Sequence, residues 1–253
     1  MKPKISFFST SYKQKEFLHG FFQNLISLED WDKCELVMVR PKTFDKEEND
    51  IYDQYKDVKN FKIITINEDY GLYGCWNHAI KLCSADIITN ANTDDRRLVD
   101  CIPNVLNNFK SNIDLLYADY YVADKKELID YPTLCSTRSI LPEFSIDGLI
   151  KYCLPGSAPF WRKKFCDKND FRIDLMSAGD LHFWLNMYRN GASFKKLNEL
   201  ASVYFFNPTG QSTDKTKNKR KNYIENQIKT KFAQELFYSG EVFGKLEDIW
   251  VKL

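Results

Sequence analysis

Hydrophobic and polar residues alternate along the first hundred residues in a pattern that predicts strands and helices in turn. Short apolar runs predict four strands, at residues 4–10, 34–40, 61–66 and 85–91. Apolar positions at helical spacing predict helices at 15–28 and 73–83, and the charged segment 42–57 is expected to be a surface loop or a short helix. Strands that alternate with helices predict an α/β fold, in which helices cover both faces of a parallel sheet.

The pattern becomes less regular after residue 112. The segment 113–124 predicts one or two strands, and a stretch rich in loop residues follows through 155. Residues 177–191 predict a helix that stops at a glycine. Two further strands, at 193–197 and 201–206, and a helical C-terminal extension complete the predicted elements. Because the sequence has no internal repeat and no clean interdomain linker, we expect one domain with a mixed second half.

The composition is that of an ordinary soluble globular protein, with 43% hydrophobic and 28% charged residues in a chain of 253. The net charge of +1 gives no general field that would recruit nucleic acid or a membrane. The aromatic content of 15% suits a protein that stacks on sugars or bases, but an aromatic core explains it equally well. Composition therefore leaves the function open.

Seven cysteines are scattered along the chain without a C-x-x-C pair, and their number is odd. This pattern argues against a zinc knuckle and a disulfide framework, and indicates mostly buried free thiols in a reducing cytoplasm. The N-terminus lacks the apolar core of a signal peptide, and no run approaches the roughly 20 apolar residues of a transmembrane helix. We expect a cytoplasmic protein, at most peripheral to a membrane.

The stretch "IITNANTDDRR", residues 87–97, places two adjacent carboxylates directly after the fourth predicted strand. Asp94 and Asp95 repel each other unless water, a cation or a hydrogen-bond donor compensates their charge. One interpretation is a solvated turn, since Asn, Thr and Asp favour turns. The other is a metal site for a phosphorylated ligand, because ligands of open α/β sheets bind at the carboxyl ends of the strands.

Residues 69–97 resemble the central motifs of family 2 glycosyltransferases with the GT-A fold. The matching positions are Asp69, Gly71, Leu72, Tyr73, Asn77 and Ile80, then Ala85, Ile87 and Ile88, then Asn92, Asp94 and Asp95. The segments "LPGSAPFWRKKF" (154–165) and "FRIDLMSAGDLHFWLNMYRNGASFKKL" (171–197) resemble the acceptor-side motifs of the same family. The resemblance covers roughly residues 4–210, and the order and spacing of four motifs make it specific.

The resemblance implies a Rossmann-like, mixed and mostly parallel sheet flanked by helices. It implies a glycosyltransferase domain at 1–210, with a nucleotide-sugar-binding half at 1–97 and an acceptor half at 98–210. Residues 211–253 would be a basic loop and a helical C-terminal extension. The activity it implies is transfer of a sugar, with inversion, from a nucleotide-diphosphate donor to an acceptor hydroxyl, in glycan or polysaccharide synthesis.

A divalent cation is also implied, since Mg²⁺ or Mn²⁺ bridging the two phosphates would stabilise the leaving group. Asp94 corresponds to the last aspartate of the family's D-x-D element and is the expected metal ligand. Asp95 is expected to orient water, ribose or acceptor. Asn92 stands where many relatives carry Asp, and its neutral oxygen suits a ribose hydroxyl or a metal-bound water. We therefore expect the metal to bind mainly together with the nucleotide.

Thr10, Ser11 and Tyr12, at the tip of the first strand, match where the family holds the nucleobase and ribose. Ser11 could equally be the N-cap of the first helix. The family often shows D-D-G-S after the second strand, and its first Asp approaches the base. Here "VRPKTFDKE" (39–47) stands instead, so the choice among UDP, GDP and dTDP stays open. Asn77 could reach the donor or be an ordinary polar helix residue.

Asp180 matches the carboxylate that takes the proton from the acceptor hydroxyl in an inverting transfer. A helix start would favour its ionised form, but an N-cap aspartate is the alternative. Asp174 is a weaker candidate for this base and is expected to be structural. His182 could line the acceptor pocket, while Trp161 and Trp184 are expected to be core residues rather than sugar platforms.

The basic run at 213–222 allows three interpretations: a solvated segment, a lid over the diphosphate, or a docking patch for anionic lipid or nucleic acid. Glycan or lipid-linked glycan is the acceptor class that the resemblance favours, and the sequence leaves the oligomeric state open. Two other functions compete. A nucleotidyltransferase would need a glycine-rich loop after the first strand, which is absent. A non-catalytic sugar-nucleotide- or glycan-binding relative would lack the Asp pair or Asp180, and both are present.

Overall fold

The computed structural model of the chain describes residues 2–167, 169–175, 178–207, 215–235 and 246–253. For residues 215–222 and 246–247 it describes the backbone only. The part of the basic run at 213–214 lies outside the described residues, and from residue 215 the run belongs to a helix.

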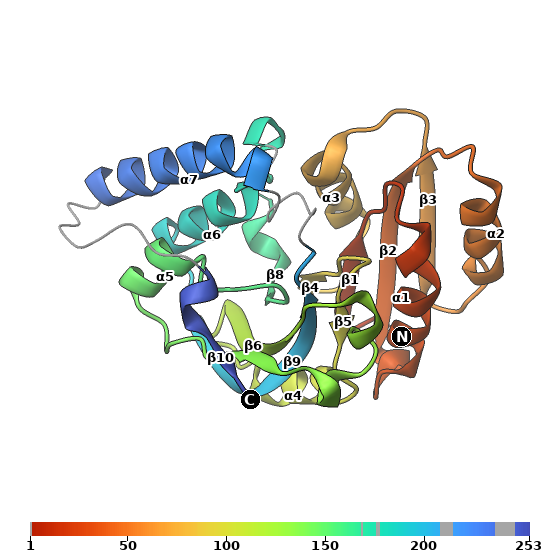
Figure 1. Ribbon diagram of the computed structural model, residues 1–253, viewed down its shortest axis with the longest axis horizontal. Coiled ribbons are helices and arrows are strands. Elements are labelled where there is room, and N and C mark those ends of the chain that lie inside the picture. Colours follow the sequence, from red (N-terminus) through yellow and green to blue (C-terminus); the bar gives the residue numbers. More distant parts are fainter. Residues whose placement is uncertain (1, 168, 176–177, 208–214, 236–245) are drawn as a thin grey trace.

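The first half of the chain forms a parallel sheet in the strand order β3-β2-β1-β4 (Figure 1). The strands are β1 (Ile5–Ser9), β2 (Cys34–Pro41), β3 (Phe61–Ile66) and β4 (Ile87–Asn90). Three helices connect them: α1 (Lys15–Ser27), α2 (Lys46–Tyr55) and α3 (Gly71–Leu82). The predicted strands and helices of this half are confirmed. The segment 42–57 contains the short helix α2, and Asp45 is its N-cap, because its side chain accepts the Glu48 N–H at 3.1 Å.

The second half extends the same sheet in the order β10-β7-β6-β8-β4. Its strands are β5 (Arg96–Arg97), β6 (Leu115–Ala123), β7 (Thr137–Ser139), β8 (Phe160–Arg162), β9 (Phe194–Phe205) and β10 (Trp250–Lys252). Its helices are α4 (Cys101–Asn108), α5 (Ile146–Tyr152), α6 (Gly179–Arg189) and α7 (Lys215–Glu235). Short 3₁₀ turns lie at Trp31–Lys33, Lys126–Leu128, Pro132–Leu134, Lys163–Phe165, Ile173–Leu175 and Leu246–Ile249.

The prediction of two separate strands at 193–197 and 201–206 was wrong. These residues form one strand, β9, which pairs parallel with β6 along most of its length. The polar residues between the two apolar runs form an irregularity in β9, where the step from Leu197 to Ser202 lies opposite the shorter step from Ala118 to Tyr120 in β6. Such an irregularity lets a strand absorb extra residues without ending.

The C-terminal extension differs from the expected helical segment because it ends in a strand. β10 pairs antiparallel with β7 and so becomes an edge of the sheet. The Trp250 indole donates a hydrogen bond to the Tyr120 hydroxyl at 3.1 Å and packs against Tyr204 and Phe206. Packing of this half-buried indole favours the strand over a continued helix, since a Trp ring removes a large apolar area from water.

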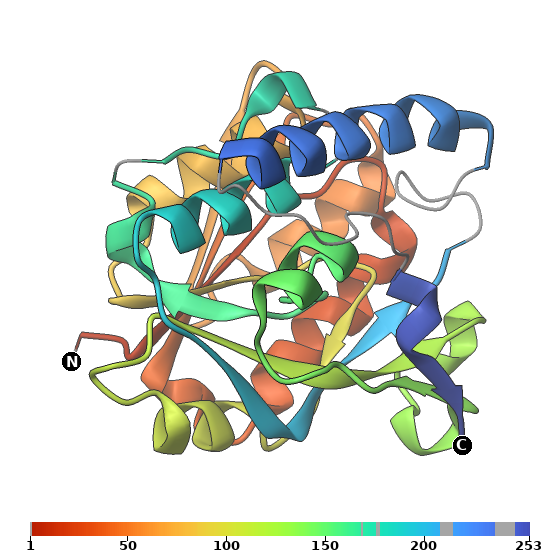
Figure 2. The same ribbon diagram turned by 90° about the vertical axis from the view of Figure 1, so that its left-hand side faces the viewer.

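Helices cover both faces of the sheet. The apolar sides of α1, α2 and α4 pack on one face, and those of α3, α5 and α6 pack on the other. Figures 1 and 2 both show α7 lying over α6, where Tyr188 contacts Phe232. Trp161 and Trp184 are 0% and 2% exposed, so the prediction that both are core residues is confirmed.

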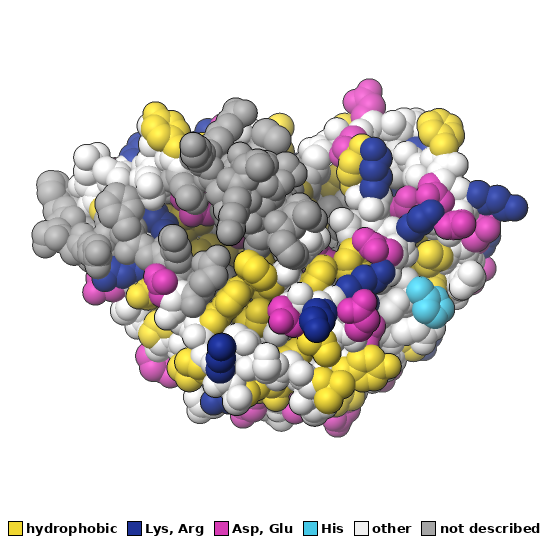
Figure 3. Space-filling view, in the orientation of Figure 1, with side chains coloured by type: hydrophobic (Ala, Val, Ile, Leu, Met, Phe, Trp, Pro, Cys, Tyr) yellow, Lys and Arg dark blue, Asp and Glu magenta, His cyan; other side chains and the backbone are white. Residues whose placement is uncertain are grey.

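The seven cysteines are free thiols, five of them buried and two half-buried, as the sequence predicts. Acidic and basic side chains are mixed on the surface over α1 and α2 (Figure 3), which agrees with the net charge of +1. Within the described ranges no helix is both long enough and apolar enough to cross a bilayer.

Candidate functional site

The carboxyl ends of β1 and β4 form the topological switch point of the sheet. The chain leaves β1 toward β2 and β3 on one side, then returns through α3 to place β4 on the other side of β1. Crevices at such points are where open α/β sheets bind ligands. Thr10 and Ser11 follow β1 here, and the turn that contains Asn92 and the Asp pair follows β4.

Asp95 points into the protein and holds its own turn together. It is 4% exposed, and its Oδ1 accepts the Phe205 N–H at 3.0 Å. Its Oδ2 accepts a hydrogen bond from Asn92 Nδ2, also at 3.0 Å. Because both carboxylate oxygens are engaged, the geometry favours a positioning role for Asp95 over direct contact with ribose or acceptor.

Asp94 is the member of the pair whose carboxylate remains available. It is half-buried, and among the described residues no side chain or backbone N–H outside its own residue bonds to that carboxylate. Burial raises the pKa of Asp94, while burial and the Asp94 charge together raise the pKa of Asp95 to about 7. A bound cation would relieve both effects, since an opposite charge favours the ionised form.

The turn offers one available carboxylate, that of Asp94, which could hold a divalent cation only together with further ligands. Within the described residues no group of three or more His, Cys, Asp or Glu side chains is close enough to form a complete metal site. Mg²⁺ and Mn²⁺ take oxygen ligands and bind through one or two carboxylates plus substrate phosphates. One available carboxylate, Asp94, beside the neutral Asn92 fits this mode of binding.

Two arginines that were not among the candidate residues, Arg96 and Arg97, bond to the turn and to the end of β4. Arg96 Nη1 donates to the backbone oxygens of Thr93 and Asp95 at 3.0 and 2.9 Å. Arg97 Nη2 donates to Thr89 Oγ1 at 3.0 Å and to the backbone oxygen of Asn90. Both side chains are buried, which is unusual for arginine. Their place directly after the Asp pair was the available signal, because buried carboxylates need cations nearby.

Asp180 lies in the first turn of α6. A contact with Tyr73 holds this helix start at the carboxyl edge of the sheet. Tyr73 belongs to the first turn of α3, and α3 follows the carboxyl end of β3. Its hydroxyl accepts the Gly179 N–H at 3.1 Å and lies 3.5 Å from Asp180 Oδ1. A Cβ at Gly179 would come within 2.6 Å of the Tyr73 ring, so glycine permits this contact.

The N-cap interpretation of Asp180 was wrong. The residue at the N-cap is Ala178, and Asp180 Oδ1 accepts the neighbouring Leu181 N–H at 2.8 Å from within the helix. Among the described residues Asp180 Oδ2 has no hydrogen-bond partner. The carboxylate is therefore held by one oxygen while the other is available to a ligand.

Thr10, Ser11 and Tyr12 follow the tip of β1, the strand that pairs with β4. Ser11 is buried, and the N-cap of α1 is Gln14, so the N-cap interpretation of Ser11 was wrong. Thr10 is half-buried, and Tyr12 is 56% exposed with the Lys13 ammonium 5.0 Å from its ring centre. An exposed aromatic ring beside a buried hydroxyl is a suitable surface for a base and a ribose.

Asn77 is occupied within the protein. Its Nδ2 donates to the Phe171 backbone oxygen at 2.8 Å, and its Oδ1 accepts the Phe171 N–H at 2.9 Å. The contact ties α3 to the segment before α6. Of the two interpretations left open by the sequence, the geometry favours the structural one.

The remaining candidates lie at the margin of the site. Asp174 is exposed and forms an ion pair with Arg172, which agrees with a structural role. The His182 ring lies 3.2 Å from Asn186 Nδ2, and burial lowers its pKa. Neither residue contacts Asp94 or Asp180 through an observed hydrogen bond.

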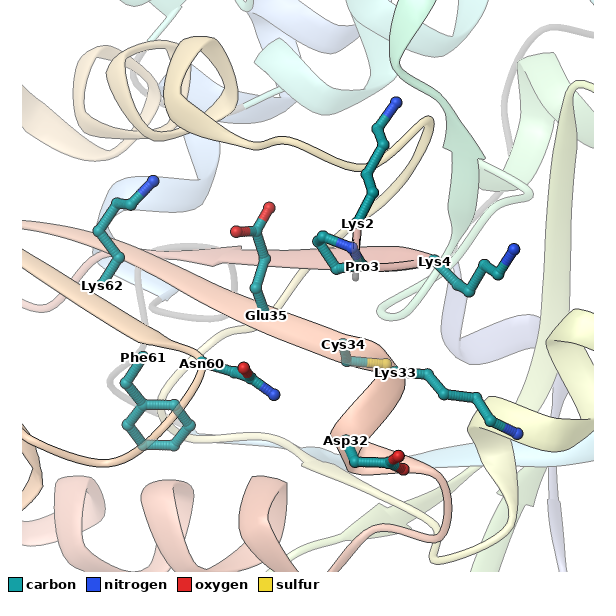
Figure 4. A pocket seen from close by; sticks show the side chains of 10 residues that line it. All are labelled: Lys2, Pro3, Lys4, Asp32, Lys33, Cys34, Glu35, Asn60, Phe61 and Lys62. Atoms are coloured by element: carbon teal, nitrogen blue, oxygen red, sulfur yellow. The ribbon is translucent and has the colours of Figure 1, made fainter.

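A shallow pocket of about 240 Å³ lies at the opposite, amino-terminal edge of the sheet (Figure 4). Lysines surround it, but Lys2 pairs with Asp86 at 2.9 Å and Lys33 pairs with Asp30 at 2.8 Å. The Glu35 carboxylate within it accepts hydrogen bonds from two serines. Because the charges of Lys2, Lys33 and Glu35 are already compensated within the protein, the carboxyl edge is the better candidate site.

Comparison with known proteins identifies the family. A family model described as "Glycosyl transferase family 2" matches residues 6–167, more than half of the chain. The chain belongs to glycosyl transferase family 2. The matched region includes the switch point and the turn of Asp94, and it ends before Asp180. No match was found among curated proteins.

Solved structures share the fold of this family 2 glycosyltransferase at low sequence identity. S. aureus TarS 1–349 in complex with UDP-GlcNAc has a TM-score of 0.69 and 14% identity, over 94% of this chain and 73% of that one. The mannosyltransferase PcManGT from Pyrobaculum calidifontis, in complex with GDP-Man and Mn²⁺, has a TM-score of 0.64 and 11% identity, over 96% and 66%. A longer S. aureus TarS structure has a TM-score of 0.66 and 15% identity, over 94% of this chain and 44% of that one. The predicted GT-A fold is confirmed.

Proposed function

We propose that this family 2 glycosyltransferase moves a sugar from a nucleotide-diphosphate donor to an acceptor hydroxyl with inversion, using Mn²⁺ or Mg²⁺ bound together with the diphosphate. One observation carries the proposal: two carboxylates far apart in the sequence, Asp94 and Asp180, both stand at the carboxyl edge beside the switch point. Solved structures of the same fold hold UDP-GlcNAc, or GDP-Man with Mn²⁺, which supports a nucleotide-sugar donor and a divalent cation.

Asp94 is the residue that would hold the cation. Its half-buried carboxylate lacks an observed protein partner, and its raised pKa reflects a charge that burial destabilises. When bound, the cation would neutralise the charge that grows on the leaving diphosphate. Asn92 and Asp95 keep the turn in shape, and the buried Arg96 holds its backbone from the other side.

Asp180 is the proposed base. The acceptor oxygen attacks the anomeric carbon, the bond from that carbon to the diphosphate oxygen breaks, and the nucleoside diphosphate leaves with the electron pair. The proton of the acceptor hydroxyl passes to Asp180 Oδ2, the oxygen without an observed partner. Tyr73 and the Leu181 N–H orient this carboxylate through Oδ1.

The nucleoside would lie over the tips of β1 and β2. Thr10 and Ser11 offer hydroxyls to the ribose, and the exposed Tyr12 ring offers a face to the base. The acceptor would approach from the side of α6. A glycan or lipid-linked glycan is the acceptor class we propose, and its use in polysaccharide synthesis with contact to a membrane surface belongs to the same proposal.

Titration of UDP and GDP into the protein, with Mn²⁺ and with EDTA, tests this function. We expect at least one nucleotide to bind markedly better with Mn²⁺, and Asp94→Ala to abolish the difference. Asp100→Ala is a matched control, because Asp100 is an exposed carboxylate a few residues further along whose side chain caps no helix N–H. Equal affinity with and without metal would refute the metal assignment.

A further inference from the structure

The guanidinium of Arg40 is buried at the carboxyl end of β2 with donors that lack partners. Arg40 is 8% exposed, and among the described residues its Nε and Nη1 make no hydrogen bond. Only Nη2 is engaged, at a long 3.3 Å from Asn49 Oδ1. A buried donor without an acceptor is costly, and a native structure retains one where something else supplies the acceptor.

The surroundings hold the Arg40 side chain in place without satisfying it. The guanidinium carbon lies 3.7 Å from the centre of the Tyr52 ring, so α2 supports the group from one side. Burial lowers the pKa of Arg40, and the buried Glu48 carboxylate nearby opposes this effect only in part. No carboxylate of the described residues forms an ion pair with the Arg40 guanidinium. The group is thus rigid, charged and short of acceptors.

Unpaired buried polar atoms are frequent at the carboxyl edge of the sheet, where Arg40 lies. Of the nine such side-chain atoms among the described residues, five lie at the carboxyl ends of β1, β2 and β4: Ser11 Oγ, Gln14 Oε1, Arg40 Nε, Arg40 Nη1 and Asn90 Oδ1. The last paired residues of β1 and β2 are Ser9 and Met38, and Ser11 and Arg40 each follow two residues later along the chain. This clustering indicates that one ligand supplies the missing partners at this edge.

The position of Arg40 matches the base end of a nucleotide whose diphosphate lies at Asp94. The strand order β4-β1-β2 puts β2 two strands from β4, or about 10 Å at the usual strand spacing. That separation is similar to the length of a nucleoside and too long for direct contact with the same phosphates. An arginine is a donor only, so it pairs with acceptor atoms of a base and cannot accept from a ring N–H.

We propose that Arg40 selects the nucleobase of the donor and favours an edge with two adjacent acceptor atoms, which among uracil, thymine and guanine only guanine has. Guanine presents O6 and N7 side by side, and arginine binds this pair in a bidentate manner. In uracil and thymine the two carbonyl oxygens flank an N–H, which a guanidinium cannot pair. The inference rests on the proposed function and adds that the donor is GDP-linked.

Affinities of the intact protein for nucleoside diphosphates in the presence of Mn²⁺ test this inference. We expect GDP to bind about 5- to 150-fold more tightly than UDP or dTDP, the range that one good bidentate contact gives. 7-Deaza-GDP, which lacks the N7 acceptor, should bind more weakly than GDP. Inosine diphosphate keeps O6 and N7 and should bind nearly as well as GDP. CDP is a second probe, because cytosine also has two adjacent acceptors, O2 and N3.

Arg40→Met tests the residue itself, since methionine keeps an apolar stem over Tyr52 but donates no hydrogen bond. GDP affinity should fall to nearly that of UDP, and the effect of 7-deaza substitution should disappear. Arg138→Met is the control: Arg138 lies in β7, at the other end of the sheet, and also has a buried Nε without an observed partner. Its loss should leave the ratio of GDP to UDP affinity unchanged.

The outcomes separate this inference from the proposed function. If UDP binds as well as GDP, or if Arg40→Met leaves their ratio unchanged, the inference is overturned while the function stands. Tight CDP binding beside tight GDP binding supports the two-acceptor rule. If no nucleotide diphosphate binds, the function and the inference both fail. Should Arg40→Met not fold, the comparison of GDP, 7-deaza-GDP and UDP on the unmodified chain decides.

Discussion

The Tyr73 hydroxyl links α3 to Asp180: it accepts the Gly179 N–H at 3.1 Å and lies 3.5 Å from Asp180 Oδ1. Burial, and then the negative charge of Asp180, raise the pKa of Tyr73, so its hydroxyl keeps its proton at neutral pH and donates it to the carboxylate. A residue of α3, in the first half of the chain, thus orients the proposed base in α6.

Tyr73→Phe should therefore lower kcat while leaving donor affinity nearly unchanged. A hydrogen bond to a charged group contributes about 1.5–3 kcal/mol when well formed, and the 3.5 Å distance places this one at the weak end. We expect kcat to fall about 3- to 10-fold, corresponding to about 1 kcal/mol. Steady-state kinetics at saturating acceptor would measure it.

Tyr117→Phe is the matched control, because it also removes a tyrosine hydroxyl that bonds within the protein, to the Pro142 backbone oxygen at 2.8 Å. Tyr117 belongs to β6 and not to the contact with Asp180. It should lower stability without changing kcat. A Tyr73→Phe enzyme with parent kcat would show that Asp180 needs no support from this hydroxyl.

Gly179→Ala should disrupt the same contact from the other side. The added methyl group would lie 2.6 Å from Tyr73 Cε2 and 2.8 Å from Cζ, so the ring or the helix start must move. Overpacking of this kind costs about 1–3 kcal/mol, which lowers Tm by roughly 2–12 °C in a chain of this size. Differential scanning calorimetry would measure the loss.

The combination of Gly179→Ala with Tyr73→Ala distinguishes overpacking from a simple helix effect. If the ring causes the cost, its removal should relieve it, and the double variant should lose less stability than the two single variants added together. Strict additivity of the three stabilities would contradict the steric explanation and place the effect in the backbone of α6.

Much of this site could be predicted from the sequence, because its positions follow from strand ends. The apolar runs locate β1 and β4, and residues directly after parallel strands must gather at one edge. The position of Asp94 at that edge could therefore be predicted from the sequence alone. The spacing around Asp180 predicted a helix start, which α6 confirms.

The rest depends on contacts between residues far apart, which no local pattern encodes. Asp94 and Asp95 are equivalent in sequence, but the Phe205 N–H, 110 residues further along, accounts for the inward orientation of one of them. From the sequence Asn77 could reach the donor or be an ordinary polar helix residue, and only the Phe171 backbone, which bonds to both ends of its amide, favours the second. The burial of Arg40 likewise follows from how α2 packs on the sheet, through Tyr52.

The stability of the nucleotide-free protein should fall as pH rises toward neutrality. The pKa of Asp95 is raised from 3.8 to about 7 by burial and by the charge of Asp94. Between those pH values the folded state holds a proton that the unfolded state has lost, so the free energy of unfolding decreases with rising pH. Below about pH 4 this contribution is constant, and above about pH 7 its cost is complete.

Melting curves from pH 4.5 to 8 would measure this effect, and saturating Mn²⁺ with a nucleoside diphosphate should reduce it, since the cation compensates the pair. Asp94→Asn removes the like charge and should also flatten the curve. The exposed Asp100→Asn variant is the control and should follow the parent. A parent protein whose stability rises from pH 5 to 7 would contradict the assigned protonation.

The sharpest prediction compares Asp180→Asn with Asp94→Asn, because the two carboxylates are given different roles. Asp180→Asn keeps the shape of the side chain and can still accept the Leu181 N–H, but it cannot take a proton. General-base assistance is typically worth about 10²–10⁴ in rate, so turnover should fall by roughly that factor while donor affinity changes little. Asp94→Asn should instead weaken metal-dependent donor binding, with a matching loss in kcat/KM. Calorimetric titration of the donor nucleotide, beside a transfer assay, separates the two patterns. If Asp180→Asn transfers sugar at nearly the parent rate, the base must be another carboxylate, and Asp174, exposed and beside the same helix start, is the next to replace.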